Sequence, residues 1–275
     1  MSYIYSLILG IIQGLTEFLP VSSSGHLILA RVLLKFESID GLTFDVAMHM
    51  GTLLAVIAYF YRDILWLLRG FWESLTGPRR LGSGESRIDE LLPWFIIAGN
   101  IPAAFVGYFF EAQIEFYFRN PAVIVVTLSV VAVLFLIFER ISIQTIEFKA
   151  LTFRKCLLIG VAQTLALIPG TSRSGITILA GIVQGVKRAS AARFSFLLSV
   201  PVMAGAGLKK AIDLRHTGIS GDDMGVLLVG LLSSALVGWL AIKFLLRYLQ
   251  NHRLDGFAYY RLVLAAVVLV VILVR

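Results

Sequence analysis

Side chains that can act on a phosphate group are concentrated in two short segments of this 275-residue chain. The first segment carries Glu17, Ser23 and His26, and the second carries Arg173. A serine hydroxyl can attack or bind phosphate, and a histidine or glutamate can serve as the base. Arginine presents a planar fork of donors that matches phosphate oxygens. These residue types favour a phosphate-containing substrate over a carboxylate or a cation.

Neighbouring positions add hydroxyl groups and a flexible backbone to both segments. They are Ser22, Ser24 and Gly25 in the first and Ser172, Ser174 and Gly175 in the second. Helix starts that follow such breaks present free N–H groups to an anion, so we expect these residues to bind substrate. Gln13 precedes Glu17 by four residues and shares a helical face with it. This pair could also hold one hard divalent ion through oxygens.

The elements that position these residues lie in a membrane, as the composition indicates. Hydrophobic residues make up 58% of the chain and charged residues 15%, against roughly 45–50% and about 25% in soluble domains. This excludes a soluble enzyme, a disordered chain and a nucleic-acid-binding module. The net charge of +7 is explained by the Lys and Arg enrichment of cytoplasmic loops. We expect residues 1–275 to form one polytopic membrane domain.

Eight apolar stretches can be marked along the chain. Six resemble ordinary transmembrane helices: 44–61, 91–110, 121–138, 194–211, 224–246 and 257–274. The other two, 4–30 and 156–183, are each interrupted by a run of Pro, Ser and Gly. Such breaks occur at membrane depth only where they are buried in protein or line a wet cavity. Each of the two is therefore predicted to be a helix, a break and a second helix.

The two broken segments are similar to each other. An offset of 150 residues without gaps produces nine identities between positions 10–30 and 160–180, including the Ser and Gly residues of the breaks. We interpret this as an internal duplication, with a first repeat at 1–145 and a second at 151–275.

The direction of the second repeat depends on whether the broken segments cross the membrane. If both cross, each half has four spans and the repeat is parallel. If both are re-entrant, each half has three spans and the second half is inverted. The re-entrant model places seven Lys and Arg on the side of the termini and fifteen on the other side. The richer side is then cytoplasmic, and the first break is reached from outside. The predicted fold is all-α, with six transmembrane helices and two re-entrant helical hairpins in an inverted-topology repeat.

Three further expectations concern residues outside the two breaks. Arg261, near the start of the last apolar stretch, is expected to extend to the membrane surface. His49 is expected to pack between helices, with a contact to the catalytic groups as the alternative. The polar stretch 62–90, rich in Gly, Pro and Arg, is expected to be a flexible cytoplasmic loop.

Two motifs resemble a known family. Residues 13–26, Gln-Gly-Leu-Thr-Glu-Phe-Leu-Pro-Val-Ser-Ser-Ser-Gly-His, closely resemble the first signature of the bacterial undecaprenyl-diphosphate phosphatases of the bacitracin-resistance type. Residues 169–175, Pro-Gly-Thr-Ser-Arg-Ser-Gly, resemble the second signature. Length, order and spacing also fit, so that the resemblance covers the whole chain.

The resemblance implies a hydrolase of the bacterial plasma membrane with its active site toward the outer face. It would convert undecaprenyl diphosphate to undecaprenyl phosphate and phosphate, which recycles the lipid carrier of cell-wall peptidoglycan synthesis. Glu17 would be a catalytic or metal-linked carboxylate, Ser23 the nucleophile or a phosphate contact, and His26 the acid/base or an orienting group. Arg173 would clamp the diphosphate together with the serines beside it.

The resemblance also implies a requirement for magnesium or calcium near Glu17 and Gln13. Many family members carry a glutamate where this chain has Gln13, so a bound cation would meet one fewer negative charge. The expected partners are the polyprenyl diphosphate lipid and the membrane, with a homodimer as a further option and no nucleic acid. The alternative function is a transporter or flippase of a polyprenyl phosphate, which needs a bound anion but no nucleophile or base.

Overall fold

The computed structural model describes residues 2–34, 41–76, 84–118, 120–217 and 221–274. Within them the chain is almost entirely helical. The first part forms α1 (Ser2–Phe18), α2 (Ser23–Leu34), α3 (Gly41–Tyr59), α4 (Tyr61–Thr76), α5 (Gly84–Phe118) and α6 (Pro121–Ile141). The second part forms α7 (Phe153–Gln163), α8 (Arg173–Val183), α9 (Arg188–Thr217), α10 (Gly221–Asn251) and α11 (Asp255–Val274). Short 3-10 turns lie at Phe148–Ala150 and Thr164–Leu167.

Five helices of the described part are long and apolar enough to cross a membrane: α5, α6, α9, α10 and α11. Helices α3 and α4 make a sixth span if they are counted together, although they are bent by 78°. The five unbroken helices match five of the stretches predicted as ordinary spans, and α1–α2 and α7–α8 match the two predicted broken segments. The sixth predicted span, 44–61, corresponds to α3, which ends at the sharp bend into α4. The prediction of an all-α polytopic membrane protein is confirmed.

The prediction of a flexible loop over 62–90 is wrong for the described residues. Helix α4 extends to Thr76 and α5 begins at Gly84, while residues 77–83 lie outside the described part. Helix α4 has an apolar face that packs on α5, where the Phe71 and Trp94 rings lie 4.9 Å apart. The Trp94 indole also donates to the Ser74 hydroxyl at 2.9 Å. The Gly, Pro and Arg content of the stretch masked this amphipathic pattern.

Both hairpins follow from the residues at their breaks. Helix α1 ends at Phe18, two residues before Pro20, because proline disfavours a helical conformation in the residue that precedes it. In the second hairpin, Gly170 has φ +86°, and a Cβ atom there would lie 2.2 Å from Thr127 Oγ1. Only glycine fits such a position, so the break must form at this residue.

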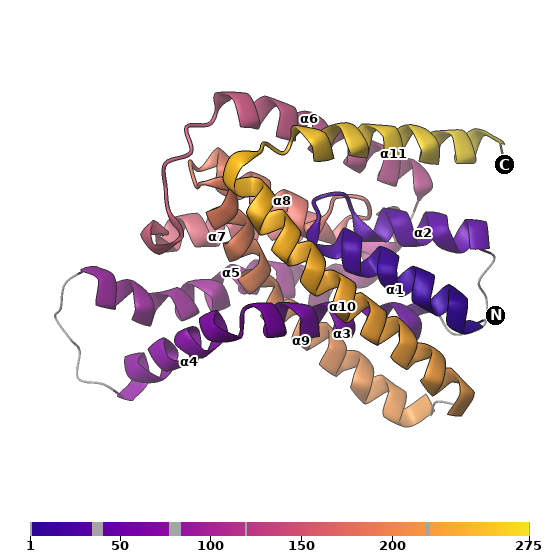
Figure 1. The fold of residues 1–275 in the computed structure, drawn as a ribbon, viewed down its shortest axis with the longest axis horizontal. Coiled ribbons are helices and arrows are strands. Elements are labelled where there is room, and N and C mark those ends of the chain that lie inside the picture. The colour runs from indigo at the N-terminus through magenta and orange to yellow at the C-terminus, as the bar shows by residue number, and fades with distance from the viewer. Residues whose placement is uncertain (1, 35–40, 77–83, 119, 218–220, 275) are drawn as a thin grey trace.

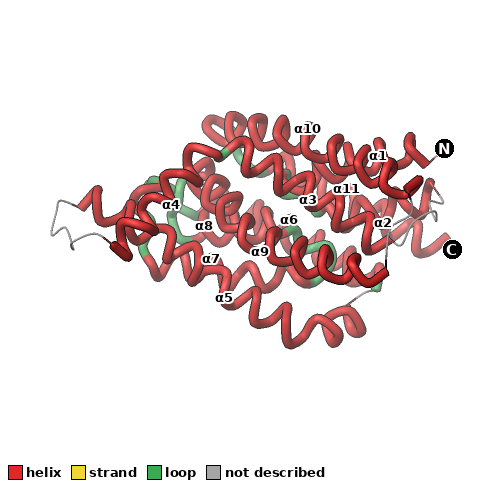
Figure 2. The backbone as a smooth tube through the Cα atoms, turned by 90° about the horizontal axis from the view of Figure 1, so that it is seen from below, coloured by secondary structure: helices red, strands yellow, loops and turns green. Residues whose placement is uncertain are grey.

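The hairpins enter the molecule from opposite ends (Figure 1). Helix α1 starts at the end that carries both termini, and α2 returns to it. The second hairpin opens at the other end, where the Lys155 ammonium on α7 donates to the Gln184 carbonyl just after α8. Both views place the start of α1 and the end of α11 at one end of the molecule and the end of α4 and the start of α5 at the other (Figures 1 and 2). These described helix ends are arranged as the re-entrant model predicts, while the repeat boundaries remain a prediction.

Each hairpin packs against a long helix of the other half. Helix α1 lies on α10, and α7 lies on α5. Glycines permit both close approaches: a Cβ atom at Gly10 would lie 1.9 Å from Ser233 Oγ, and one at Gly160 would lie 2.0 Å from the Gly99 carbonyl oxygen. Small residues at helix interfaces are the usual means of tight packing in membranes. Because each hairpin packs against a helix of the other half, the tips of the two hairpins meet inside the bundle.

Candidate functional site

The hairpin tips touch through their backbones and serines. The Gly170 N–H donates to Ser24 Oγ at 3.4 Å, and the Ser174 hydroxyl donates to the Leu19 carbonyl at 3.2 Å. The two predicted breaks, 150 residues apart in sequence, therefore form one structure.

The two breaks also share a local geometry. Ser22 has φ +76° and Ser172 has φ +71°, which is a region that L-residues rarely adopt. Each of these serines caps the following helix, because its Oγ accepts the N–H of Gly25 or Gly175, at 3.4 and 3.1 Å. Each Oγ also lies 3.2 Å from the hydroxyl of the serine two residues further on. Such strained residues often mark functional sites.

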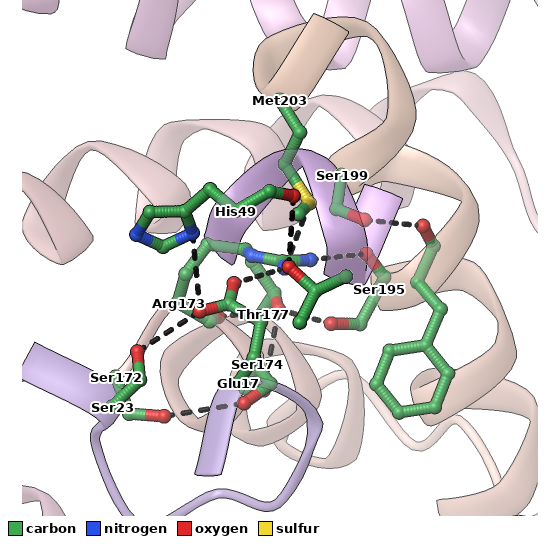
Figure 3. A network of polar contacts seen from close by, with 12 residues as sticks. Glu17, Ser23, His49, Ser172, Arg173, Ser174, Thr177, Ser195, Ser199 and Met203 are labelled. Carbon is green, nitrogen blue, oxygen red and sulfur yellow. Dashed lines mark hydrogen bonds and ion pairs between the residues drawn. The ribbon is translucent and has the colours of Figure 1, made fainter. Parts of the chain in front are cut away.

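Glu17 is the centre of the polar network between the tips (Figure 3). The residue is only 8% exposed. Its Oε1 accepts from Arg173 Nη2 at 2.8 Å, and its Oε2 accepts from Ser23 Oγ at 2.9 Å and Gln13 Nε2 at 3.1 Å. His49 Nδ1 lies 3.6 Å from Oε2 and 3.0 Å from Gln13 Nε2. His49 thus contacts the candidate catalytic groups, which was the less favoured of its two interpretations.

Helix α9 holds Arg173 in place. Arg173 Nη1 donates to the Ser195 carbonyl at 3.3 Å, and Nη2 lies 3.6 Å from Met203 Sδ. The Thr177 hydroxyl connects the two helices, with Oγ1 2.7 Å from the Arg173 carbonyl and 2.6 Å from Ser195 Oγ. The arginine side chain is 14% exposed. It can therefore still meet a ligand at the edge of the network.

His26 has different partners. Its Nδ1 lies 2.7 Å from the Ser22 carbonyl and its Nε2 lies 2.7 Å from the Tyr260 hydroxyl. Because a carbonyl only accepts, Nδ1 carries the proton and Nε2 accepts from the tyrosine. The two rings are also stacked, with centroids 5.6 Å apart. Within the described residues, no hydrogen bond joins His26 to Glu17 or Ser23.

Arg261 corrects a prediction. It was expected at the membrane surface, but it is 0% exposed. Its guanidinium donates to backbone carbonyls of α6 and of both breaks: Thr127, Leu128, Pro20, Gly170 and Thr171. Five carbonyl acceptors offset part of the cost of burying this cation. A lone arginine in an otherwise apolar stretch was the signal for such a buried site.

The residues beside Glu17 can be compared with the requirements of a divalent cation. Among the described residues, no group of three His, Cys, Asp or Glu side chains is placed to hold a metal. However, Gln13 Oε1 is buried and has no hydrogen-bond partner in the described structure. With the Glu17 carboxylate it offers the oxygen ligands that magnesium and calcium prefer, and substrate phosphates commonly complete such a shell. The residues thus fit a cation that the protein shares with its substrate.

The fold and the site together define a polytopic membrane protein with a buried polar network between two broken helices. The chain matches the model of the bacitracin resistance protein BacA family over residues 6–267. It therefore belongs to this family.

Individual relatives align along nearly the whole chain. The undecaprenyl-diphosphatase of Rubrobacter xylanophilus is 43% identical over 98% of this chain and 97% of its own length. The undecaprenyl-diphosphatase of Geotalea daltonii is 44% identical over 96% of both chains. That of Geobacter sulfurreducens is 44% identical over the full length of both.

Proposed function

We propose that this protein is a membrane phosphatase that converts undecaprenyl diphosphate to undecaprenyl phosphate and phosphate. One observation carries the proposal: a buried carboxylate, Glu17, accepts hydrogen bonds both from a serine hydroxyl, Ser23, and from the guanidinium of Arg173. The network supplies a nucleophile, a base and a phosphate-binding cation at one point. The names of the relatives, which match along their whole length, support the same substrate.

The diphosphate binds at the paired helix starts. The first N–H groups of a helix lack partners within it and favour anions. Helices α2 and α8 both begin at the joined tips, so their N-terminal ends add to the charge of Arg173. Ser24 and Ser174 bring hydroxyl groups to the same place. The serines and glycines of the two breaks therefore bind substrate mainly by shaping this anion site.

Ser23 is the nucleophile in this mechanism. Its Oγ attacks the terminal phosphorus, its proton passes to Glu17, and the bond from that phosphorus to the bridging oxygen breaks. Undecaprenyl phosphate leaves, and Ser23 carries the phosphoryl group. A water oxygen then bonds to the phosphorus, the Oγ–phosphorus bond breaks, and the proton of Glu17 returns to Oγ as dihydrogen phosphate departs. The 2.9 Å contact between Oγ and Oε2 suits Glu17 as the base.

Arg173 stabilises the charge that develops on the transferred phosphoryl oxygens, because phosphoryl transfer depends mainly on positioning and electrostatic stabilisation. His26 is an orienting group: its proton on Nδ1 holds the Ser22 carbonyl next to Ser23. Gln13 and Glu17 would hold a magnesium or calcium ion through their oxygens, and such an ion would supply positive charge to neutralise the phosphate.

The site faces the outer side of the bacterial plasma membrane. The re-entrant topology assigns fifteen Lys and Arg to the side opposite the termini and seven to the side of the termini, which supports the end with the termini as the outer one. The first hairpin opens toward that end (Figure 1). The lipid carrier is thus recycled in the outer leaflet. A homodimer stays a prediction.

Phosphate release by the purified protein in detergent tests the proposal. Wild-type protein should release phosphate from undecaprenyl diphosphate, and Arg173→Ala should not. A wild-type protein that binds the lipid and moves it between leaflets of a vesicle, without releasing phosphate, would establish the transporter alternative instead.

A further inference from the structure

We propose that Arg261 is a positioning residue for the reaction. Its side chain fixes both breaks, and its uncompensated positive charge lies next to the hairpin tips. This inference rests on the proposed phosphatase function. Arg261 does not belong to either of the two broken segments. It lies on α11, which packs beside α6 (Figure 1).

Arg261 joins corresponding points of the two breaks. Its Nη1 donates to the Pro20 carbonyl at 3.2 Å and its Nη2 to the Gly170 carbonyl at 3.1 Å. These two positions are separated by the 150-residue offset that aligns the broken segments. Each lies two residues before a strained cap, Ser22 or Ser172. One side chain therefore controls the path of the backbone into both helix starts.

Three further contacts anchor the guanidinium. Nη2 also donates to the Thr171 carbonyl at 3.1 Å, and Nε and Nη2 donate to the Leu128 and Thr127 carbonyls of α6, at 3.2 and 3.3 Å. The breaks are thus tied to a transmembrane helix instead of only to each other.

The charge of Arg261 differs from that of Arg173. Arg173 is paired with Glu17 at 2.8 Å, so this pair adds little net charge. Among the described residues, no carboxylate forms an ion pair with Arg261. A buried cation without a counter-ion is costly even when carbonyl dipoles surround it. An anionic diphosphate at the hairpin tips would supply the missing counter-charge, and Arg261 would favour its binding.

Two substitutions separate the geometric and electrostatic roles. Arg261→Lys keeps the charge but has only three donors for five carbonyls. We expect its kcat for phosphate release to fall on the order of tenfold to a hundredfold, while its KM stays within about threefold of wild type. Arg261→Met removes the charge as well, so its KM should also rise, by about tenfold or more. Arg188→Lys is the matched control, since Arg188 binds Glu139 on α6 without touching the breaks.

Hydrogen exchange of the purified variants in detergent distinguishes positioning from general loss of structure. In Arg261→Lys, amide exchange should accelerate at 18–24 and 168–175 and remain as in wild type along α10. The inference is overturned if Arg261→Lys has wild-type kcat, if kcat falls without faster exchange at both breaks, or if exchange rises throughout the chain. Wild-type protein that releases no phosphate would instead refute the proposed function, and the exchange pattern would still test the positioning role.

Discussion

Ser23 and Arg173 occupy corresponding positions in the two breaks and donate to different oxygens of the same carboxylate, that of Glu17. The 150-residue offset that aligns the broken segments places one residue on the other. Each is the first residue of a helix, α2 or α8, directly after a strained serine. The same backbone geometry therefore delivers a nucleophile from one side and a cation from the other.

Replacing Ser23 with alanine should abolish turnover. Without a hydroxyl, no phosphoserine can form, and kcat should fall on the order of a thousandfold or more. Ser129→Ala is the control, because the Ser129 hydroxyl on α6 donates to the Val125 carbonyl of its own helix. The rate of phosphate release is measured for both variants. When the wild-type protein is mixed with substrate labelled at the terminal phosphate and quenched rapidly, labelled protein should be trapped. A Ser23→Ala variant that retains turnover would instead show that water attacks the phosphorus.

Arg173→Lys should reduce kcat/KM about a hundredfold, although the charge is kept. Lysine cannot reproduce the planar fork that reaches Glu17 and the Ser195 carbonyl together. Arg193→Lys provides the comparison, since Arg193 pairs with Asp63 on α4 instead of with Glu17. Equal kinetics for the two variants would show that Arg173 acts through its charge alone.

Gln13→Glu should increase the affinity for a divalent cation. The substitution adds a negative charge next to Glu17, where the amide oxygen of Gln13 has no partner within the described structure. Phosphate release by the wild type should fall on chelation, and the half-activating magnesium or calcium concentration should be about tenfold lower for the variant. Gln163→Glu is a matched control, because Gln163 is the corresponding residue of the second hairpin and binds Asn100. Unchanged cation dependence in Gln13→Glu would argue against a shared ion.

His26→Asn should retain activity within about tenfold of wild type. The asparagine amide can still donate to the Ser22 carbonyl, which is the orienting contact of His26 Nδ1. His26→Phe can stack on Tyr260 but cannot donate, so it should lose more. The dependence of kcat/KM on pH should keep its shape in His26→Asn. The loss of one limb of that profile in this variant would identify His26 as an acid or base.

Gly160→Ala should destabilise the protein, because its Cβ atom would lie 2.0 Å from the Gly99 carbonyl oxygen at the α5–α7 contact. Overpacking of this kind costs about 1–3 kcal/mol. Gly205→Ala, also in a helix, meets nothing within 4 Å. It should leave stability unchanged or raise it by about 0.5–1 kcal/mol. Thermal unfolding in detergent compares the two, and equal midpoints would contradict the tight helix contact.

The parts of the fold that depend on local residue patterns could be predicted from the sequence. Pro20 and the Pro169–Gly170 pair interrupt apolar stretches, so both breaks were evident. The contacts of Glu17 with Ser23 and Arg173 agree with the internal similarity, because broken helices of inverted repeats commonly meet near the middle of the membrane.

Contacts between distant segments could not be predicted in the same way. The burial of Arg261 depends on five carbonyls that only the folded chain brings together. The partner of His26, Tyr260, lies 234 residues away. No periodicity in the sequence relates these positions, so His26 was grouped with its neighbours in sequence.

The corresponding positions of Ser23 and Arg173 in the two breaks also bear on the ancestry of the site. If the halves descend from one sequence, the ancestor was a pair of identical chains that met in opposite orientations, and positions 23 and 173 held the same residue. Such a pair could place two serines or two arginines around a carboxylate, but never one of each. Division of labour between the hydroxyl and the cation required two copies that could diverge from each other. In the present chain one segment supplies Ser23 and the other supplies Arg173, so each supplies only part of the site.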